Sequence, residues 1–321
     1  EHEISDSIRD KLARFCNVDT DCVIQSLDVK TIYDVPNHML SEGLDKVVLK
    51  KLGLKSSKPD LSSWNQFLNK YKHPKRAVRI ALIGKYIELQ DSYKSILESF
   101  IHSGAVNEVR VEVIPIHSEH INKDNIAEKL ENFNGVLVAP GFGGRGIEGK
   151  IESIKHVRLN NIPFFGICLG MQMAVIEFSR NILKLDDANS TEMDLKTKYP
   201  VIDMMDDQKK IINKGGTMRL GSWECKLKKN SLVSKIYNCD TIHERHRHRY
   251  EFNSEYFKDI EENGMFATGI NSDTGLVEII ELKNHPWFVG VQFHPEYKST
   301  VLSPHPLFVS FIAAATKHSN N

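Results

Sequence analysis

The chain has 321 residues, of which 40% are hydrophobic and 26% charged, and its 42 Lys and Arg residues balance 42 Asp and Glu residues to a formal net charge of +0. A chain of this length can bury one large core and carry an attached segment. The balanced charge excludes a whole-protein field that would attract nucleic acid or an anionic membrane. No apolar run approaches the roughly 20 residues that a membrane helix needs, so we expect no nucleic acid and no membrane among its partners.

The cysteines indicate the compartment. Their number is odd and they include no CxxC pair, which argues against a disulfide framework and against a zinc site. The first residues, EHEISDSIRD, are too charged for a signal peptide. We therefore expect a reducing, cytoplasmic setting and no metal site. The five positions are Cys16, Cys22, Cys168, Cys225 and Cys239.

The first 76 residues predict helices and loops. The apolar spacing of IRDKLARFC, residues 8–16, predicts an amphipathic helix, and VIQSLDV, residues 23–29, predicts a short strand. A Ser-, Pro- and Lys-rich stretch at residues 54–63 predicts a linker, and a helix follows in which Leu61, Trp64, Leu68 and Tyr71 share one face. We divide this part into residues 1–55 and a linker with an amphipathic helix at residues 56–76.

Residues 77–317 predict the main domain. Up to residue 183, continuously apolar strands alternate with helices, which indicates an open, mostly parallel sheet covered by helices on both faces. Ligands in such folds bind at the carboxyl ends of the strands. The expected strands are 77–86, 109–116, 135–140 and 163–168, and a helix at 92–104 should end with Gly104 as its C-cap.

Beyond residue 183 the period falls toward two, which predicts an added antiparallel portion. A helix at residues 304–318 closes the domain. The strand candidates are 217–227, 244–252, 265–270 and 276–282.

Cys168 lies where a buried strand turns directly into a helix. The segment Gly166-Ile167-Cys168-Leu169-Gly170 has the form of a nucleophile elbow, in which flanking glycines permit a strained turn that exposes the nucleophile. The helix N-terminus behind it favours a thiolate. The alternative is that Cys168 is a small buried hydrophobic residue, as most free cysteines are. The two glycines at the strand-to-helix switch favour the nucleophile.

A thiol nucleophile requires a base and an orienting acceptor. His294 and Glu296 follow an apolar strand in WFVGVQFHPEY. Residues at i and i+2 of an extended segment point to the same side, so Glu296 can hold the His294 imidazole while its other nitrogen faces Cys168. A His and a Glu in a solvated loop are commonplace, so this pair indicates catalysis only in combination with the nucleophile elbow at Cys168.

Two sets of motifs carry a family resemblance. GICLGMQ together with QFHPE resembles the class I, triad-type glutamine amidotransferases, whose fold is flavodoxin-like. EFSRNIL, DANSTEMD, GGTMRLG and ERHRHRYEFN resemble CTP synthases in particular, and EHEISDSIR and SLDVKTIYDVP are similar to the end of the synthetase domain of those enzymes. The resemblance runs over essentially the whole chain.

The resemblance implies a division of roles in glutamine hydrolysis. Cys168 would be the nucleophile, His294 the general base and acid, and Glu296 the group that orients it. Backbone N–H groups of Gly141 and Leu169 would hold the oxyanion, which needs no cofactor. The residues implied to bind L-glutamine are Gly141, Phe142, Leu169 and Gln172, with Glu192 and Arg249 at its charged end.

The resemblance also implies partners for a larger reaction. Ammonia would pass to an N-terminal synthetase domain of the same polypeptide, which uses ATP and Mg²⁺ to convert UTP to CTP, with GTP as allosteric activator and a homo-tetramer as assembly. The residues implied to contact ATP are Leu27, Asp28 and Val29. Those implied to respond to GTP are Arg145, Gly146, Glu148, Thr217 and Arg219.

The basic stretch HERHRHRYE permits several interpretations. Nucleic-acid binding is disfavoured because acids bracket the stretch and no aromatic residues interleave it. A metal held by His246 and His248 lacks a third ligand at the usual spacing. On a strand, Arg245, Arg247 and Arg249 fall on one face that suits a carboxylate or an interdomain acid, and a solvated charged strand is the alternative.

Two departures from the family pattern leave alternatives open. Pro140 replaces the first glycine of the oxyanion loop, which supports a catalytically weakened regulatory or assembly module as a rival hypothesis. A free-standing cysteine hydrolase acting on γ-glutamyl groups or peptides is a third, disfavoured by Glu192 and Arg249. No G-x-x-x-x-G-K-[ST] loop occurs, and an initial Met is absent, so we expect the synthetase site on a preceding segment.

Overall fold

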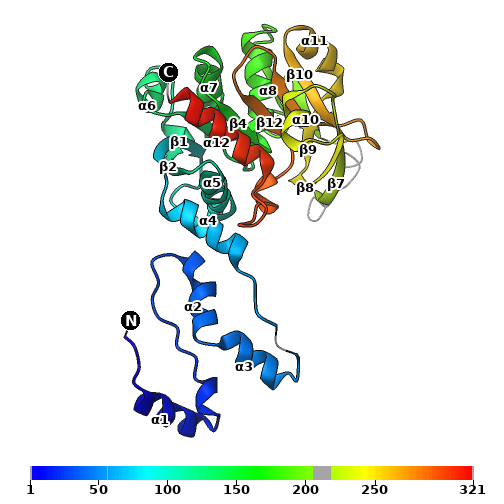
Figure 1. Ribbon diagram of the computed structural model, residues 1–321. Helices are drawn as coiled ribbons and strands as arrows, with labels where there is room; N and C mark the ends of the chain where they lie inside the picture. The colour runs from blue at the N-terminus through cyan, green and yellow to red at the C-terminus, as the bar shows by residue number, and fades with distance from the viewer. Residues whose placement is uncertain (1, 56, 205–217, 320–321) are drawn as a thin grey trace. The chain divides into compact units, whose positions relative to one another are not determined.

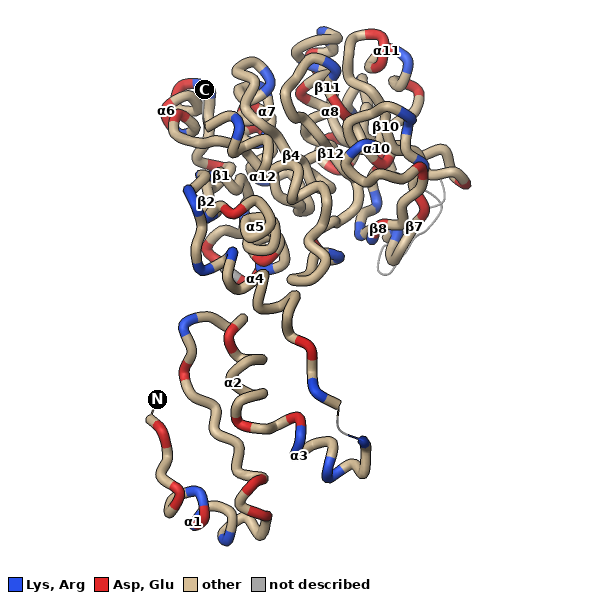
Figure 2. Tube along the Cα trace, in the orientation of Figure 1, with Lys and Arg blue, Asp and Glu red and all other residues tan. Residues whose placement is uncertain are grey.

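The computed structural model describes residues 2–55, 57–204 and 218–319, and it divides into two compact units, Glu1–Lys72 and His73–Asn321 (Figure 1). The division falls within residues 56–76, which the sequence assigns to a linker. Basic and acidic residues are distributed along both units (Figure 2), as the balanced composition predicts.

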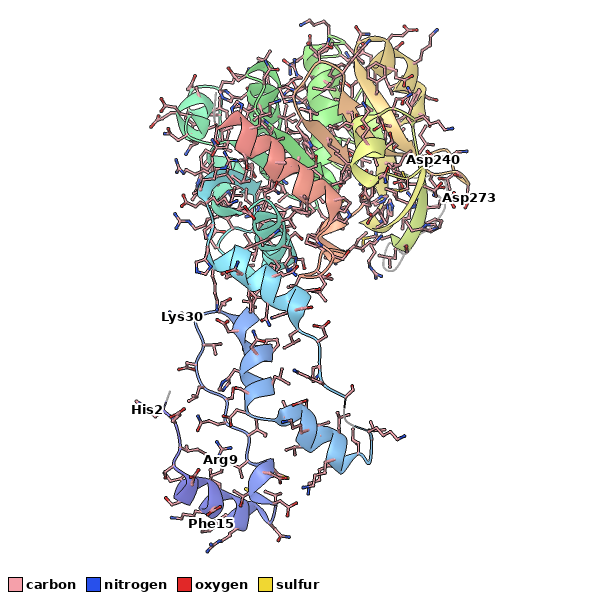
Figure 3. All side chains as sticks on the ribbon, viewed as in Figure 1. His2, Arg9, Phe15, Lys30, Asp240 and Asp273 are labelled. Carbon is pink, nitrogen blue, oxygen red and sulfur yellow. The ribbon has the colours of Figure 1, made fainter. Side chains whose placement is uncertain are left out.

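The first unit consists of short helices. Arg9, labelled in Figure 3, ties α1 to later parts of the unit, because its guanidinium donates to the carbonyl of Val23 at 2.6 Å and to Glu42 at 3.2 Å. Helix α4 carries an aromatic cluster in which the rings of Tyr33 and Phe67 lie 5.0 Å apart. The elements are α1 (Asp6–Cys16), η1 (Thr20–Cys22), η2 (Ile32–Asp34), α2 (Val35–Ser41), α3 (Leu44–Lys51) and α4 (Ser62–Lys72).

The strand predicted at residues 23–29 is wrong. This segment has no regular structure, and two of its N–H groups are bound by side chains instead of a neighbouring strand. The N–H of Gln25 donates to Glu42 at 3.1 Å and that of Leu27 to the imidazole of His38 at 3.1 Å. An alternating apolar pattern forms a strand only where a second strand completes the ladder.

The second unit is built on a nine-stranded sheet with the order β2-β1-β3-β4-β12-β11-β10-β7-β8. The strands from β2 to β12 in this order are parallel, and those from β12 to β8 are antiparallel. The predicted parallel sheet with an antiparallel addition is confirmed. The strands are β1 (Arg76–Gly84), β2 (Val109–His117), β3 (Gly135–Val138), β4 (Phe164–Ile167), β7 (Arg219–Leu227), β8 (Thr241–His248), β10 (Met265–Ile270), β11 (Val277–Leu282) and β12 (Phe288–Val291).

Helices cover both faces of this sheet. Ala81 and Ile83 of β1 face a core shared with α7 and α8, whereas Ile80 and Leu82 face a second core shared with α5 and α12. Figure 1 shows α12 crossing its face of the sheet. The helices are α5 (Lys94–Val106), α6 (Ile126–Leu130), α7 (Ile147–Leu159), α8 (Leu169–Asn181), α10 (Leu232–Tyr237), α11 (Phe257–Glu262) and α12 (Pro306–His318), with 3₁₀ turns η3 (Gln90–Tyr93), η4 (Ser118–His120), η5 (Ser254–Tyr256) and η6 (Pro295–Tyr297).

Gly104 is not a C-cap, because α5 continues to Val106. A Cβ at this position would lie 2.8 Å from the carbonyl oxygen of Val109 and 3.0 Å from the Val111 side chain. The glycine therefore lets α5 approach β2, and its place near a helix end misled the sequence interpretation.

A separate three-stranded sheet lies beside the elbow helix. It has the order β5-β6-β9 and joins β5 (Ala188–Ser190), β6 (Tyr199–Met204) and β9 (Tyr250–Phe252). Val201 and Phe252 of this sheet are buried in the same core as α8. Among the described helices, none has both the length and the apolar character to cross a membrane.

Candidate active site

Cys168 sits on a strained turn between β4 and α8. Its backbone angles are φ 53° and ψ −104°, a conformation that a non-glycine residue adopts only where the surroundings impose it. A Cβ on Gly166 would lie 2.8 Å from the backbone of Gly170, and one on Gly170 would overlap the carbonyl oxygen of Val138. Both flanking glycines are therefore required by close backbone packing at the turn.

Strand β12 brings a second set of side chains to the same edge. It runs parallel to β4, with Val291 opposite Ile167, and the N–H of Cys168 donates to the carbonyl of Val291 at 2.7 Å. Residues that follow the two strands therefore emerge side by side at their carboxyl ends. The N–H of His294 donates to the carbonyl of Arg245 at 2.8 Å, so β8 fixes the backbone of this histidine.

His294 and Glu296 form a buried charge-assisted pair. The imidazole Nδ1 donates to Glu296 Oε1 at 2.7 Å, and both residues are 5% exposed. Burial opposes charge on His294, but the Glu296 carboxylate and the Cys168 thiolate outweigh it and raise its pKa well above the usual value. The contact arises differently from the sequence argument, because Pro295–Tyr297 form a 3₁₀ turn where an extended segment was expected.

The sulfur of Cys168 has a neighbour that the sequence reasoning missed. Cys168 is 2% exposed, and Nε2 of Gln292 lies 3.6 Å from its Sγ. Gln292 is itself bound by Gln172, whose Nε2 donates to Gln292 Oε1 at 3.1 Å. The available signal was position, since Gln292 directly follows β12 at the edge where Cys168 follows β4.

The loop of residues 139–143 lies against the elbow. A Cβ on Gly141 would lie 3.6 Å from the Leu169 side chain, so the two proposed oxyanion donors belong to adjacent segments. Within the described residues, the N–H of neither residue donates a hydrogen bond, which leaves both available to an anion.

Two lysines that the sequence analysis did not single out brace this loop. Lys85 Nζ donates to the carbonyl of Phe142, and Lys150 Nζ donates to the carbonyl of Ala139 at 3.0 Å. Lys150 is fully buried. Burial and the neighbouring Lys85 lower its pKa to about 7, and Cys168 opposes that shift. No sequence pattern marks a lysine on α7 as buried, because its neighbours come from β3 and the loop.

Two of the residues implied to bind glutamine, Phe142 and Glu192, are found at the same loop. Glu192 accepts the N–H of Gly143 at 2.7 Å. Phe142 is 42% exposed, and the Arg247 guanidinium lies 5.8 Å from the centroid of its ring. Arg249 directly precedes Tyr250, whose pKa is raised by burial and then by the charge of Glu192. Gln172 is buried, and its Nε2 also donates to the Tyr250 carbonyl at 2.9 Å.

Comparison with known proteins identifies this arrangement. Residues 88–314 match the family described as "Glutamine amidotransferase class-I". The chain belongs to this family. Residues 1–54 match a second description, "CTP synthase N-terminus", so both units of the amidotransferase have recognisable relatives.

Individual relatives of the amidotransferase are described as CTP synthases. The chain is 67% identical to a CTP synthase of Christiangramia forsetii over 99% of its length and 59% of that protein, and 64% identical to one of Flavobacterium psychrophilum over 100% of its length and 60% of that protein. It therefore spans about three fifths of these relatives. A solved structure, the glutaminase domain of Trypanosoma brucei CTPS with bound acivicin, is 39% identical, covers 75% of the chain and 94% of that domain, and has a TM-score of 0.70.

A buried charge cluster of the amidotransferase lies beside the His294 segment. We define it as Arg219, His246, His248, Glu251 and Glu278. Arg219 pairs with Glu278 at 2.7 Å and Glu251 at 3.4 Å, and Nδ1 of His246 lies 2.8 Å from Nε2 of His248. Burial holds the pKa of both histidines far below, and that of both acids above, their usual values.

The basic stretch HERHRHRYE has one exposed face and one buried face on β8. The alternation on β8 is as predicted, since Arg245 and Arg247 are exposed. The opposite face holds the two histidines in the core, and His246 contacts the ring of Phe293 at 5.9 Å between centroids. Arg249 follows the end of β8, so it does not continue the arginine face as the sequence suggested.

The residues implied to respond to GTP have other partners here. Arg145 pairs with Glu119 at 3.0 Å and Glu148 with Arg180 at 3.0 Å. Gly146, with φ 72°, turns the loop into α7. Arg219 pairs with Glu278 inside the buried charge cluster. The sequence did not predict that this proposed GTP-contacting residue would be buried. Thr217 lies outside the described residues.

In the first unit, the residues implied to contact ATP lie in the irregular segment 23–29. Leu27 donates its N–H to His38 Nε2 at 3.1 Å, Asp28 is exposed, and Val29 is half-buried. Among the described residues, Asp19, Asp21 and Cys22 have ligand atoms close enough to share a cation. The two carboxylates instead pair with Lys51 and Lys50, each at 2.9 Å.

Proposed function

We propose that this amidotransferase hydrolyses L-glutamine with Cys168 as nucleophile, His294 as general base and acid, and Glu296 as the group that orients it. One observation carries the proposal: the strained turn after β4 and the buried His294–Glu296 pair after β12 emerge from neighbouring parallel strands. Families of cysteine hydrolases share this constellation of thiol, imidazole and carboxylate.

The proposed reaction has two stages. The Cys168 thiolate attacks the side-chain carboxamide carbon of glutamine, and the N–H groups of Gly141 and Leu169 stabilise the oxyanion that forms. The C–N bond then breaks as His294 gives its proton to the departing ammonia, which leaves a γ-glutamyl thioester on Cys168. Water attacks the thioester while His294 removes its proton, and the C–S bond breaks to release glutamate and the thiolate.

We infer that glutamine is held by residues around the loop 139–143. Phe142, Gly141, Leu169 and Gln172 would contact its side chain. Glu192 and Arg249 offer opposite charges for the amino and carboxyl groups of the free amino acid, which supports free glutamine over a peptide as substrate.

We further propose that the ammonia serves an ATP-dependent conversion of UTP to CTP. The support is the description of the curated relatives as CTP synthases and the match of residues 1–54 to the N-terminal region of that family. The sequence has no G-x-x-x-x-G-K-[ST] phosphate-binding loop, and Leu27, Asp28 and Val29 are the candidate contacts with ATP. ATP and Mg²⁺ would therefore be held by other parts of the polypeptide. A cytoplasmic homo-tetramer remains part of this proposal.

We also propose GTP as activator, acting on the loop before α7. Arg145 supplies a cation and Gly146 a left-handed turn at the N-terminus of α7, features that suit a phosphate-bearing ligand, and the acid Glu148 follows in the first turn of that helix. Thr217 and Arg219 complete the proposed set by resemblance alone.

Whether Pro140 weakens glutamine turnover decides between an enzyme and a regulatory module.

The test is ammonia release from L-glutamine by the 321-residue chain, its Cys168→Ala variant and the matched Cys239→Ala variant, in which an exposed cysteine is removed. We expect release by the chain and by Cys239→Ala and none by Cys168→Ala. A chain that releases no ammonia, with or without GTP, would favour the regulatory module. Equal release by all three proteins would remove Cys168 from the chemistry.

A further inference from the structure

A chain of side-chain hydrogen bonds runs from the thiol of Cys168 into the core. Nε2 of Gln292 donates to Cys168 Sγ at 3.6 Å, Nε2 of Gln172 donates to Gln292 Oε1 at 3.1 Å, and the same Nε2 donates to the Tyr250 carbonyl at 2.9 Å. We propose that Gln292 is a further catalytic residue, which donates a hydrogen bond to the Cys168 thiolate, and that Gln172 positions it. This inference rests on the proposed role of Cys168 as nucleophile.

The orientation of the Gln292 amide follows from its partners. The oxygen and nitrogen of an amide are assigned from the hydrogen-bond network. The Tyr250 carbonyl can only accept, so it fixes the NH₂ group of Gln172 on that side of the chain. The second N–H of Gln172 then needs an acceptor, which must be Gln292 Oε1. The NH₂ of Gln292 is therefore the group that faces the sulfur.

The backbone holds Gln292 at this place. Val291 and Ile167 are paired in the parallel ladder between β12 and β4, so the next residues, Gln292 and Cys168, leave the sheet at the same level. The N–H of Gln292 also donates to the Glu278 carbonyl of β11 at 2.9 Å. Because both neighbours are central strands, the amide is placed by the most rigid part of the fold.

Burial increases the importance of the hydrogen bond from Gln292 to the Cys168 thiolate. Gln292 is fully buried and Cys168 is 2% exposed, so water does not replace the amide at the sulfur. A thiolate that loses its hydration needs donors within the protein, and a hydrogen bond to the charged form favours that form. A neutral amide supplies the bond without adding a charge that would compete with His294 for Glu296.

The same donor serves both stages of the reaction. It stabilises the thiolate before attack, and it stabilises the thiolate that leaves when the thioester is hydrolysed. The thioester sulfur between these stages is neutral and a weak acceptor, so the hydrogen bond is strongest when the sulfur is charged. This asymmetry favours release of the acyl group in the second stage.

The test measures the pH dependence of alkylation at Cys168, which does not require glutamine turnover. The 321-residue chain and its Gln292→Met and Gln292→Glu variants are treated with iodoacetamide from pH 5 to pH 10 in the absence of glutamine, and labelling is read for each cysteine by peptide mass spectrometry. Exposed Cys239 is an accessible reference thiol in the same sample, and buried Cys225, whose pKa burial raises, is an inert one. Gln66→Met makes the same substitution at an exposed position of α4.

We expect Gln292→Met to raise the midpoint of Cys168 labelling by about one pH unit, which corresponds to about 1.4 kcal/mol. Gln292→Glu should raise it further, because a carboxylate replaces the donor by a like charge, while Gln66→Met and the Cys239 profile stay unchanged. A Gln292→Met profile that superimposes on that of the parent overturns the inference. If circular dichroism shows that Gln292→Met does not fold, Gln292→Leu, which also lacks a donor and adds no charge, decides by the same criterion.

Failure of the proposed function has a different signature. A parent chain in which Cys168 is alkylated with a low midpoint but which releases no ammonia from glutamine would overturn glutamine hydrolysis. The shift caused by Gln292→Met would still be measured in that case, and the role of the amide at the sulfur would be decided independently.

Discussion

Replacing the buried Lys150 by Met should stabilise the chain below pH 7, and the gain should shrink as the pH rises. Lys150 is fully buried, and its Nζ bonds to the Ala139 carbonyl at 3.0 Å. Burial, and then the charge of Lys85, lower its pKa from 10.5 to about 7 against the opposing effect of Cys168. At about 1.4 kcal/mol per unit, the charged form carries a penalty on the order of 5 kcal/mol.

The direction in which stability changes with pH follows from the protonation of Lys150 in the folded and unfolded chain. Below pH 7 the ammonium is charged in the folded and the unfolded chain, so the folded state bears the whole penalty. Between pH 7 and 10.5 the folded chain has lost this proton while the unfolded chain retains it, and stability therefore rises with pH. Met abolishes this titration but leaves the Ala139 carbonyl without its donor, which costs about 1–3 kcal/mol. The net gain at pH 6 should be about 2–4 kcal/mol.

The assay is urea unfolding of the parent and Lys150→Met at pH 6, 7, 8 and 9.5. The advantage of the variant should fall by about 3 kcal/mol between pH 7 and pH 9.5. Lys155→Met, which removes a half-buried lysine from the same helix, is measured in parallel as the matched control for loss of a lysine side chain. A constant difference for Lys150→Met would refute the buried, low-pKa lysine.

Three further substitutions probe the site and its supports. Glu296→Gln removes the carboxylate 2.7 Å from His294 and should lower kcat for ammonia release by about 10² to 10⁴; retention of near-parental kcat would exclude its orienting role. Arg219→Leu leaves Glu278 buried without its 2.7 Å partner and should reduce the free energy of unfolding in urea by about 3–5 kcal/mol, so an unchanged midpoint would contradict the buried ion pair. Gly170→Ala should cost at least about 1–3 kcal/mol, because the methyl group meets a carbonyl of β3, and an unchanged Tm would contradict the packing at the elbow.

The sequence could predict the elements whose signals are local. The switch from an apolar strand to a helix at Cys168 and the apolar strand before His294 both follow from consecutive residues. Because β4 and β12 are parallel neighbours, the two signals meet at one edge of the sheet. The predicted strand at residues 23–29 failed for the complementary reason, since a strand depends on a partner that a local pattern does not reveal.

The supports of the site could not be predicted in this way. Gln292 and Gln172 are 120 positions apart in the sequence, and the presence of a glutamine does not indicate which partner its amide will bind. The arginine alternation on β8 was visible, but burial of its histidine face depends on acids from β9 and β11. Lysine is rarely buried, so composition alone argues against the position that Lys150 occupies.

Trapping of an acyl intermediate is the most direct test of covalent catalysis by Cys168. The chain is mixed with isotopically labelled glutamine, quenched in acid during turnover, digested and mapped by mass spectrometry, with Cys168→Ser treated in parallel. We expect a γ-glutamyl group on the peptide that contains Cys168, its disappearance when glutamine is exhausted, and no labelled peptide in Cys168→Ser. Release of ammonia without any acyl group on Cys168, at an equal rate in Cys168→Ser, would contradict covalent catalysis by this thiol.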